Sequence, residues 1–252
     1  FYDWYCDLPP GEPLTWGVQT ESCECADWFN SKYIILWGSN ISQTRIPDAH
    51  FAYEARYNGA KIVAISPDFN SSCIHADLYW RINPGSDAAL AMGVARILIE
   101  NNLIDAPYVK EQTDLPLLVV KGSRRFLRES DLQKGGKEDV FFVWDAHAGR
   151  AVPTAGSMGS TEKSIRMNGI DAALDGTFSV KLTDGQTVEV TPVFSLLRES
   201  LTAYPLEKVA QLTGLPASEI QAFAHELGTR KPAMIIHGAG TNHWFHNDLT
   251  NR

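Results

Sequence analysis

The amino-acid sequence predicts an α/β fold in which helices cover a parallel sheet. Two apolar runs of strand length, at residues 33–40 and 61–68, each end in a short polar loop. Each run is followed by a segment in which apolar residues recur at helical spacing. A strand–helix–strand–helix order with short connections is typical of βαβ units, whose strands lie parallel. The first part of the chain therefore predicts a parallel sheet with helices on its faces.

The first predicted strand lies in YIILWGSN, residues 33–40, because a continuous apolar run that ends in Gly-Ser-Asn is typical of a buried strand entering a loop. The segment IPDAHFAYEARYNGA, residues 46–60, predicts a helix, with Pro47 in its first turn and Asn58-Gly59 at its end. Four residues would form the apolar face of this helix: Ala49, Phe51, Ala52 and Ala55.

The second predicted strand is KIVAISPD, residues 61–68, which is again apolar and again ends in a polar turn. The segment INPGSDAALAMGVARILIENNLI, residues 82–104, predicts a loop and then a long amphipathic helix. Ser86 or Asp87 is the expected N-cap, because both side chains can accept hydrogen bonds from the first free backbone N–H groups.

The rest of the chain has less uniform patterns. Residues 122–176 are rich in Gly, Ser, Lys and Asp without a sustained period, which predicts an irregular excursion. Residues 178–193 alternate apolar and polar side chains on both sides of Asp184-Gly185, a hairpin signal. Residues 205–228 predict two short amphipathic helices separated by Gly214, and 231–244 a third buried strand that enters a Gly-Ala-Gly-Thr-Asn loop.

Composition narrows the classes of function. The chain has 252 residues and a net charge of −8, and its strongest basic cluster is the short KGSRR, which argues against nucleic acid as a partner. No apolar run approaches the roughly 20 residues that cross a bilayer. The cysteines, Cys6, Cys23, Cys25 and Cys73, include no C-x₂-C pair, so we expect free or buried thiols.

The loops that follow the three predicted strands are the first candidate binding site. These loops are Gly38-Ser39-Asn40, Ser66-Pro67-Asp68 and residues 238–242. Parallel sheets bind ligands at the carboxyl ends of their strands, and loop N–H groups suit phosphate. A carboxylate at Asp68 is placed to accept hydrogen bonds from ribose hydroxyls. Neither the G-x-G-x-x-G pattern nor the P-loop pattern is present, so the loops alone leave a nucleotide ligand and simple turns both open.

Asp7 and His243 are the candidate chemical groups. Asp7 precedes Leu-Pro-Pro, a stiff extended segment that can hold a carboxylate in place, as a ligand to an oxophilic metal requires. Asp7 could equally cap a turn among core aromatics. His243, in the glycine loop beside Trp244, could donate to a substrate oxygen or serve as a structural histidine. His237 is expected to be buried structure.

Five segments in order resemble the catalytic subunit of molybdenum enzymes of the dimethyl sulfoxide reductase family, in its type II branch. They are YDWYCDLPP, TWGVQTESCECADWFNSKYIILWGSNISQTRIPDAHF, ISPDFN, PGSDAALAMG and GAGTNHW. The resemblance implies a Rossmann-like dinucleotide-binding core within a fragment of a larger multidomain subunit. It divides the chain into a metal-ligand loop and βαβ region (1–120), an insertion (121–177), and a hairpin, helical pair and third strand with a pterin-side loop (178–252).

The resemblance also implies a cofactor, molybdenum held by two molybdopterin guanine dinucleotides, with Asp7 as the protein ligand to the metal. A Cys, Ser or selenocysteine takes that place outside the branch, so Cys6 is the alternative ligand. Phe1, Tyr2 and Trp4 would line the substrate entrance, and His243 and Trp244 would lie near the metal. The expected cofactor-binding residues are Trp37, Gly38, Ser39, Asn40, Thr44, Arg45, Ser66, Pro67, Asp68, Gly85, Asp87, Gly238, Gly240 and Asn242. Arg45 would supply a bidentate anion donor.

The reaction implied by the resemblance is oxygen-atom or hydroxyl exchange with a small-molecule substrate. Hydroxylation of an ethylbenzene-type hydrocarbon or oxidation of dimethyl sulfide is the first expectation, and reduction of chlorate, perchlorate, selenate or nitrate is the second. A [4Fe–4S] cluster is expected in an amino-terminal part outside this sequence, with an iron–sulfur beta subunit and a haem b gamma subunit as partners. Periplasmic location is expected, with the cytoplasm as the alternative, and the segment alone is expected to be inactive. An alternative of another class is a non-catalytic nucleotide-binding α/β domain.

Overall fold

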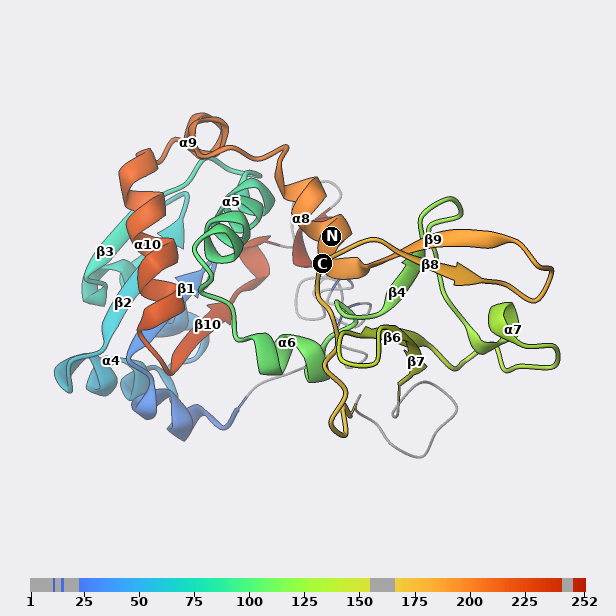
Figure 1. Cartoon of the computed structure of the whole chain (residues 1–252). Coiled ribbons are helices and arrows are strands. Elements are labelled where there is room, and N and C mark those ends of the chain that lie inside the picture. The colour runs from blue at the N-terminus through green and yellow to red at the C-terminus, as the bar shows by residue number, and fades with distance from the viewer. Residues whose placement is uncertain (1–10, 12–14, 16–22, 155–165, 242–246) are drawn as a thin grey trace. The chain divides into compact units, whose positions relative to one another are not determined.

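The computed structural model describes residues 11, 15, 23–154, 166–241 and 247–252, and they form two compact units. Unit 1 comprises the described parts of residues 1–103 and 204–252, and unit 2 comprises those of 104–203 (Figure 1). The predicted three-part division of the chain stays a prediction. No helix among the described residues is long and apolar enough to span a bilayer.

The centre of unit 1 is a four-stranded parallel sheet in the order β10-β1-β2-β3. The strands are β1 (Tyr33–Trp37), β2 (Lys61–Ser66), β3 (Leu78–Arg81) and β10 (Ala233–His237). This confirms the predicted α/β class and the strands expected near 33, 61 and 233. The sequence of β3 is less continuously apolar than those of β1 and β2, and the sequence analysis did not predict this strand.

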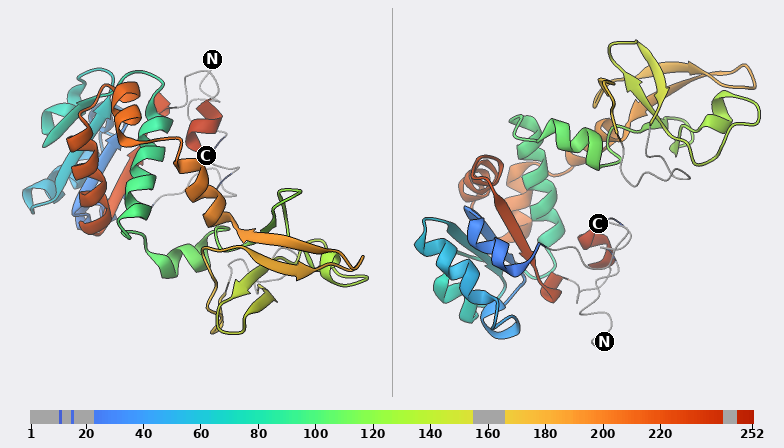
Figure 2. Two further views of the ribbon diagram at one scale, coloured as in Figure 1. Left: turned by 45° about the horizontal axis from the view of Figure 1, so that its top comes forward. Right: turned by 90° about the horizontal axis from the view of Figure 1, so that it is seen from below.

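Helices cover both faces of this sheet, as the βαβ pattern predicts (Figure 2). On one face, α5 (Asp87–Glu100), α9 (Leu206–Thr213) and α10 (Ala217–Thr229) pack on alternate strand residues such as Ile35 and Val63. On the other face, η1 (Cys25–Asn30) and α4 (Ala49–Tyr57) pack on Ile34 and Ile62. Side chains alternate across a strand, so the continuous apolar runs serve two cores at once.

The helix ends lie close to the residues that the sequence predicts, although Ser86, the N-cap of α5, makes no side-chain capping hydrogen bond and instead donates to the Asn83 carbonyl. α4 ends at Asn58-Gly59, with Gly59 at a φ of +93°, and α5 begins after Ser86. Gly214 follows α9 in the left-handed region, at a φ of +76°, and so separates α9 from α10. Pro47 lies in the turn before α4 rather than in its first helical turn.

β10 differs from the fully buried strand that its apolar sequence predicts. It is the last strand on its side of the described sheet, and Ile235 is 48% exposed. An edge strand has a neighbour on one side only, so part of its apolar surface is left uncovered. The remaining elements of unit 1 are the short α3 (Ile41–Thr44), η2 (Ser71–His75), η3 (Ala239–Thr241) and α11 (Asn247–Asn251).

A partly buried polar cluster ties the amino ends of β1 and β2 to α10. The Tyr33 hydroxyl donates to Glu226 at 3.2 Å, and the Lys61 ammonium donates to the same carboxylate at 2.5 Å. Burial alone would raise the pKa of Glu226, but the Lys61 hydrogen bond and charge hold the net pKa below its usual value. This stabilisation is therefore present above the ordinary glutamate pKa and is lost as the pH falls through the lower, folded-state pKa.

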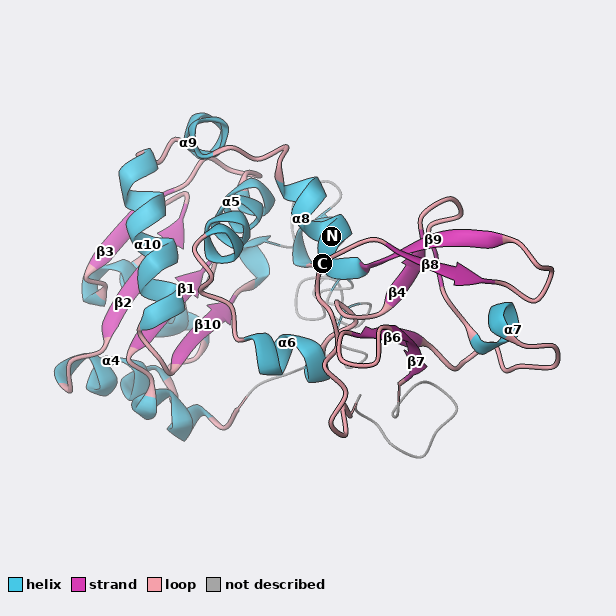
Figure 3. Ribbon diagram, in the orientation of Figure 1, coloured by secondary structure: helices cyan, strands magenta, loops and turns pink. Residues whose placement is uncertain are grey.

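Unit 2 is built mainly from antiparallel strands (Figure 3). One sheet has the order β5-β4-β9-β8 and the other pairs β6 with β7. The predicted hairpin is confirmed, because β8 and β9 pair antiparallel on either side of Gly185. Residues 125–153, expected to be irregular, contain three short strands and a helix. The elements of unit 2 are α6 (Ala106–Gln112), β4 (Leu118–Val120), β5 (Arg125–Phe126), α7 (Glu129–Leu132), β6 (Phe142–Asp145), β7 (Arg150–Pro153), β8 (Phe178–Lys181), β9 (Thr187–Pro192) and α8 (Val193–Leu201).

Candidate functional site

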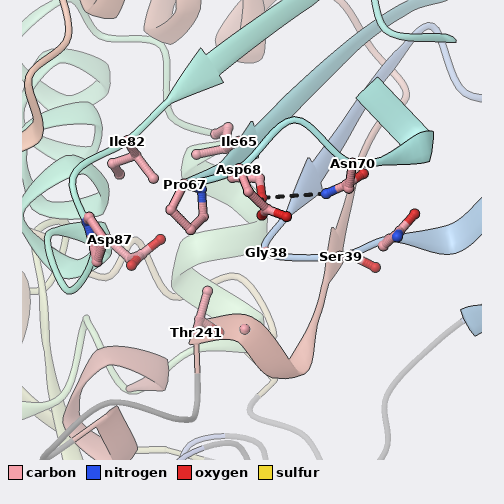
Figure 4. A pocket seen from close by; sticks show the side chains of 13 residues that line it. Gly38, Ser39, Ile65, Pro67, Asp68, Asn70, Ile82, Asp87 and Thr241 are labelled. Atoms are coloured by element: carbon pink, nitrogen blue, oxygen red, sulfur yellow. Dashed lines mark hydrogen bonds between the residues drawn. The ribbon is translucent and has the colours of Figure 1, made fainter. Parts of the chain in front are cut away.

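A cavity of about 400 Å³ lies at the carboxyl ends of the parallel strands in unit 1 (Figure 4). β2 and β10 flank β1 on opposite sides, so the chain order of the strands reverses at β1. Ligands of open α/β sheets bind in the crevice at such a switch point. The volume is within the range of small-molecule sites, roughly 300–1,000 Å³. Position and size therefore identify this cavity as the candidate binding site.

Most of the residues predicted from the strand-end loops line this one cavity. Eight predicted residues do so: Gly38, Ser39, Asn40, Ser66, Pro67, Asp68, Asp87 and Gly240. The sequence analysis did not single out five further lining residues: Ile65, Asn70, Ile82, Pro84 and Thr241. Thr241 lies within the predicted glycine loop, and Pro84 just precedes the long helix, so their places in the loops were the available signal.

The loops after β1 and β10 approach each other backbone to backbone. The Gly238 N–H donates to the carbonyl of Trp37 at 2.9 Å, and the Gly240 N–H donates to the carbonyl of Gly38 at 3.3 Å. A Cβ atom on Gly238 would lie only 2.2 Å from the Gly38 carbonyl oxygen. Gly38 itself has a φ of +60°, which glycine adopts without a steric cost. Glycine at these positions is what allows the two loops to form one wall of the cavity.

Asp87 is the more buried of the two carboxylates in the cavity wall. It is the first residue of α5 and is 8% exposed. The indole N–H of Trp37, the last residue of β1, donates to Asp87 Oδ1 at 2.8 Å. The start of a helix also favours negative charge, because free backbone N–H groups point toward it. Asp87 therefore presents a carboxylate at the cavity, with one oxygen held by the indole of Trp37.

Asp68 is exposed and is held from the loop after β2. The Ser66 hydroxyl donates to Asp68 Oδ1 at 2.9 Å, and the Asn70 amide lies 3.4 Å from that hydroxyl (Figure 4). The Asn70 side-chain oxygen in turn accepts from the backbone N–H of Ser72 in the first turn of η2, for which Asn70 is the N-cap. The carboxylate is therefore oriented by its own loop and remains open to a ligand.

The orientation of the Asn40 amide follows from its partners. The backbone N–H of Ser42 donates to the Ser72 hydroxyl at 3.0 Å, so this hydroxyl is left to donate elsewhere. It lies 2.8 Å from Asn40 Oδ1, and the Ser71 hydroxyl lies 3.0 Å from the same oxygen. Asn40 Nδ2 donates to Gln43 at 3.0 Å and keeps one further N–H. Asn40 lines the cavity and thus has one amide N–H left for a further acceptor.

Five predicted residues lie outside the cavity lining. Trp37 donates its indole N–H to Asp87, which does line the cavity, and the Gly238 N–H donates to the Trp37 carbonyl where the two loops meet. Gly85 forms the turn before α5, and the Thr44 hydroxyl donates to the Asn40 carbonyl at 2.9 Å. The Arg45 guanidinium carbon lies 6.0 Å from the ring centroid of Trp28, a cation–π arrangement. The anion-binding role expected of Arg45 stays a prediction.

The residues predicted for the metal and the substrate lie outside the described residues. They are Phe1, Tyr2, Trp4, Asp7, Asn242, His243 and Trp244. Within the described part of the chain, no three His, Cys, Asp or Glu side chains gather as a metal site. His237, expected to be structural, contacts the Thr241 hydroxyl at the end of β10.

The three described cysteines of unit 1 show no feature of an activated thiol. Cys23, Cys25 and Cys73 are free thiols, as expected. Burial raises the pKa of the Cys73 thiol, which disfavours the reactive thiolate.

The lining of the cavity fits the nucleoside end of the expected cofactor better than its phosphates. Among the described residues of the lining, two are carboxylates and none is Lys, Arg or His. Two negative charges without a lining cation repel a phosphate but accept hydrogen bonds from neutral donors. Guanine offers N–H donors on one edge and ribose offers hydroxyls, which match Asp68 and Asp87.

Comparison with known proteins finds relatives that match most of the chain. The perchlorate reductase alpha subunit of Dechloromonas aromatica (strain RCB) is 46% identical over 269 residues, covering 99% of this chain and 29% of that protein. The dimethylsulfide dehydrogenase alpha subunit of Rhodovulum sulfidophilum is 41% identical, covering 92% of this chain and 25% of that protein. The chain thus spans less than a third of the length of these relatives.

A solved structure has the same fold. Acetylene hydratase from Pelobacter acetylenicus superposes with a TM-score of 0.56 at 17% identity, covering 98% of this chain and 23% of that one. At this identity the likeness concerns the fold alone. The family model of molybdopterin oxidoreductase matches residues 1–252, the full sequence. The chain therefore belongs to the molybdopterin oxidoreductase family.

Proposed function

We propose that the cavity in unit 1 holds the guanosine end of one molybdopterin guanine dinucleotide. The observation that carries the proposal is the pair of carboxylates, Asp68 and Asp87, in one cavity at the switch point of the sheet. Each has one oxygen that already accepts from the protein, at 2.9 Å and 2.8 Å. The remaining acceptor positions suit the ribose hydroxyls and the N–H edge of guanine.

The residues of this chain would bind and orient the cofactor. Asp87 and Asp68 accept from the nucleoside, Asn40 donates to it, and the glycine loops allow its close approach to the backbone. When bound, the molybdenum–pterin group supplies the change in metal oxidation state that oxygen-atom exchange requires. Asp7 is the proposed protein ligand to the metal, and His243 and Trp244 are proposed to lie near the substrate.

Removal of the Asp87 carboxylate tests the proposed nucleoside site. We expect Asp87→Ala in the full-length subunit to lose at least one of the two guanosine ends, because the ligand donors lose a charged acceptor. Acid hydrolysis of the purified protein, with quantification of released GMP against protein, measures this. Glu219→Ala is the matched control, since Glu219 also accepts an indole N–H but does not line the cavity. Unchanged GMP in Asp87→Ala would reject the site.

For the whole subunit we propose oxygen-atom abstraction from an oxyanion as the first reaction. The support is the higher identity to a protein named perchlorate reductase, over nearly all of this chain. Oxidation of an organic sulfide is the second candidate, because a protein named dimethylsulfide dehydrogenase is 41% identical. This order reverses the sequence expectation, which favoured organic substrates. Hydroxylation of an ethylbenzene-type hydrocarbon stays a prediction.

Turnover by the complete enzyme separates these candidates. We expect the full-length complex to oxidise reduced viologen with perchlorate or chlorate faster than it oxidises dimethyl sulfide or ethylbenzene with a high-potential acceptor. Anaerobic assays of one preparation with both substrate classes provide the comparison. Faster turnover of the organic substrates would make the subunit a dehydrogenase and leave the nucleoside site unaffected.

The relatives' names also bear on partners. Both are alpha subunits, which supports assembly with further subunits. We propose an iron–sulfur beta subunit and a haem b gamma subunit as electron partners, a [4Fe–4S] cluster in an amino-terminal part, and a periplasmic location.

A further inference from the structure

We propose that Trp37 is a positioning residue, whose indole N–H sets the direction in which Asp87 accepts from the ligand. The inference rests on the proposed nucleoside site and deepens it. Trp37 does not itself line the cavity. Through Asp87, it would favour a ligand whose edge carries hydrogen-bond donors.

The hydrogen bond between Trp37 and Asp87 has only one possible direction. Trp37 ends β1 and Asp87 begins α5, 50 positions later, and each is 8% exposed. Their contact, Nε1 to Oδ1, is 2.8 Å long. An indole nitrogen can only donate, so no tautomer or amide flip changes the direction of this hydrogen bond. Trp37 is also fixed in the sheet, between Ile65 of β2 and His237 of β10.

The hydrogen bond divides the two oxygens of Asp87 between protein and cavity. Oδ1 faces the indole, whereas Oδ2 makes no hydrogen bond to any other described residue. No described Lys, Arg or His forms an ion pair with this carboxylate. A buried carboxylate is costly unless its acceptors are satisfied. Donors on the ligand would satisfy the acceptor positions of Asp87 that the indole leaves open.

Asp68 lacks this kind of support. Its donor is the Ser66 hydroxyl, a group that can rotate, and the Asp68 side chain is exposed. Asp87 is therefore the directional acceptor of the two. A ligand edge that presents an acceptor there would face a fixed negative oxygen, so the pair favours a base edge with N–H donors.

Trp80 provides a matched control in the same sheet. It lies in β3, is 2% exposed, and donates its indole N–H to Glu219 Oε2 at 2.8 Å. Trp80→Phe therefore removes the same volume and the same kind of hydrogen bond as Trp37→Phe. Neither Trp80 nor Glu219 lines the cavity.

The test measures retention of the guanosine end in the full-length holoenzyme. Protein is incubated at a low urea concentration, filtered, and assayed over time for bound GMP after acid hydrolysis. We expect Trp37→Phe to lose GMP about tenfold faster than wild type, and Trp80→Phe to stay within about twofold. In an Asp87→Ala background, Trp37→Phe should add less than about twofold, because the partner is already absent.

A further variant, Asp87→Asn, tests the same conclusion if Trp37→Phe does not fold. The indole donor should turn the carbonyl of the amide in Asp87→Asn toward itself, leaving the NH₂ group toward the ligand. Asp87→Asn should then lose GMP as fast as Asp87→Ala. Loss near the wild-type rate in Asp87→Asn would mean that the side chain is not oriented.

The other possible results separate a failure of the Trp37 inference from a failure of the nucleoside site. Equal GMP loss in Trp37→Phe and Trp80→Phe would overturn the inference, since the indole would then act through general stability. Additive loss in the double variant would also overturn it. Wild-type retention in Asp87→Ala would instead reject the proposed nucleoside site itself.

Discussion

Gly238→Ala should separate the carboxyl ends of β1 and β10 and destabilise this part of unit 1 by roughly 2–4 kcal/mol. The added methyl carbon would lie 2.2 Å from the Gly38 carbonyl oxygen and 2.6 Å from Ser39 Cα. Both are backbone atoms, so no side-chain rotation can relieve the overlap. The loops that line the cavity must move, and the cofactor content of the full-length protein should fall with them.

Hydrogen–deuterium exchange by mass spectrometry measures the local effect in the full-length protein. Peptides covering residues 33–37 and 233–237 should exchange about 100-fold faster in Gly238→Ala, since about 1.4 kcal/mol corresponds to tenfold in an equilibrium constant. Gly122→Ala is the control, because a Cβ there meets nothing within 4 Å. Wild-type exchange in Gly238→Ala would show that the two loops are not in close contact.

The elements that could be predicted from the sequence are those whose signals are local. Apolar runs marked β1 and β2, and a Gly at positive φ separated α9 from α10. The hairpin of β8 and β9 could be predicted because Asp184-Gly185 sits between two alternating segments. In each case the residues that decide the structure are close together in the chain.

The elements that could not be predicted depend on pairing with distant segments. β3 has four residues with one buried side chain, and its place is set by pairing with β2. β5 has only two residues, too few for any period to be visible. The exposure of β10 follows from its place at the end of the described sheet, which its own apolar sequence does not encode.

The candidate site divides in the same way. The rule that ligands bind at strand ends identified Gly38, Asp68 and Gly240, because it needs only the strands. Thr241 lies in the predicted loop 238–242 but was not singled out within it, and Asn70 lies two residues past Asp68, where no local pattern marks it. The role proposed for Trp37 depends on a partner 50 positions away in the chain. Sequence spacing alone reveals no such hydrogen bond.

Replacement of Asp7 should cause the largest loss of function of any change proposed for this chain. Asp7 lies outside the described residues, and the proposal rests on the motif YDWYCDLPP and on its stiff Leu-Pro-Pro support. Loss of a direct metal ligand should exceed the roughly 10–100-fold effect typical of groups that only orient ligands. We therefore expect turnover in Asp7→Asn to fall by more than about 100-fold.

The molybdenum content and the Mo(V) electron paramagnetic resonance signal of the full-length enzyme provide readouts independent of turnover. Asp7→Asn should alter the signal, whereas Asp3→Asn, a carboxylate change in the same motif, should leave it unchanged. Cys6→Ser tests the alternative ligand, because a soft thiolate also suits molybdenum. If Cys6→Ser alters the signal and Asp7→Asn leaves it normal, the protein ligand to the metal is Cys6 and not Asp7. The nucleoside site at Asp68 and Asp87 would stand in either case, because it depends on the strand ends of unit 1 and on neither Asp7 nor Cys6.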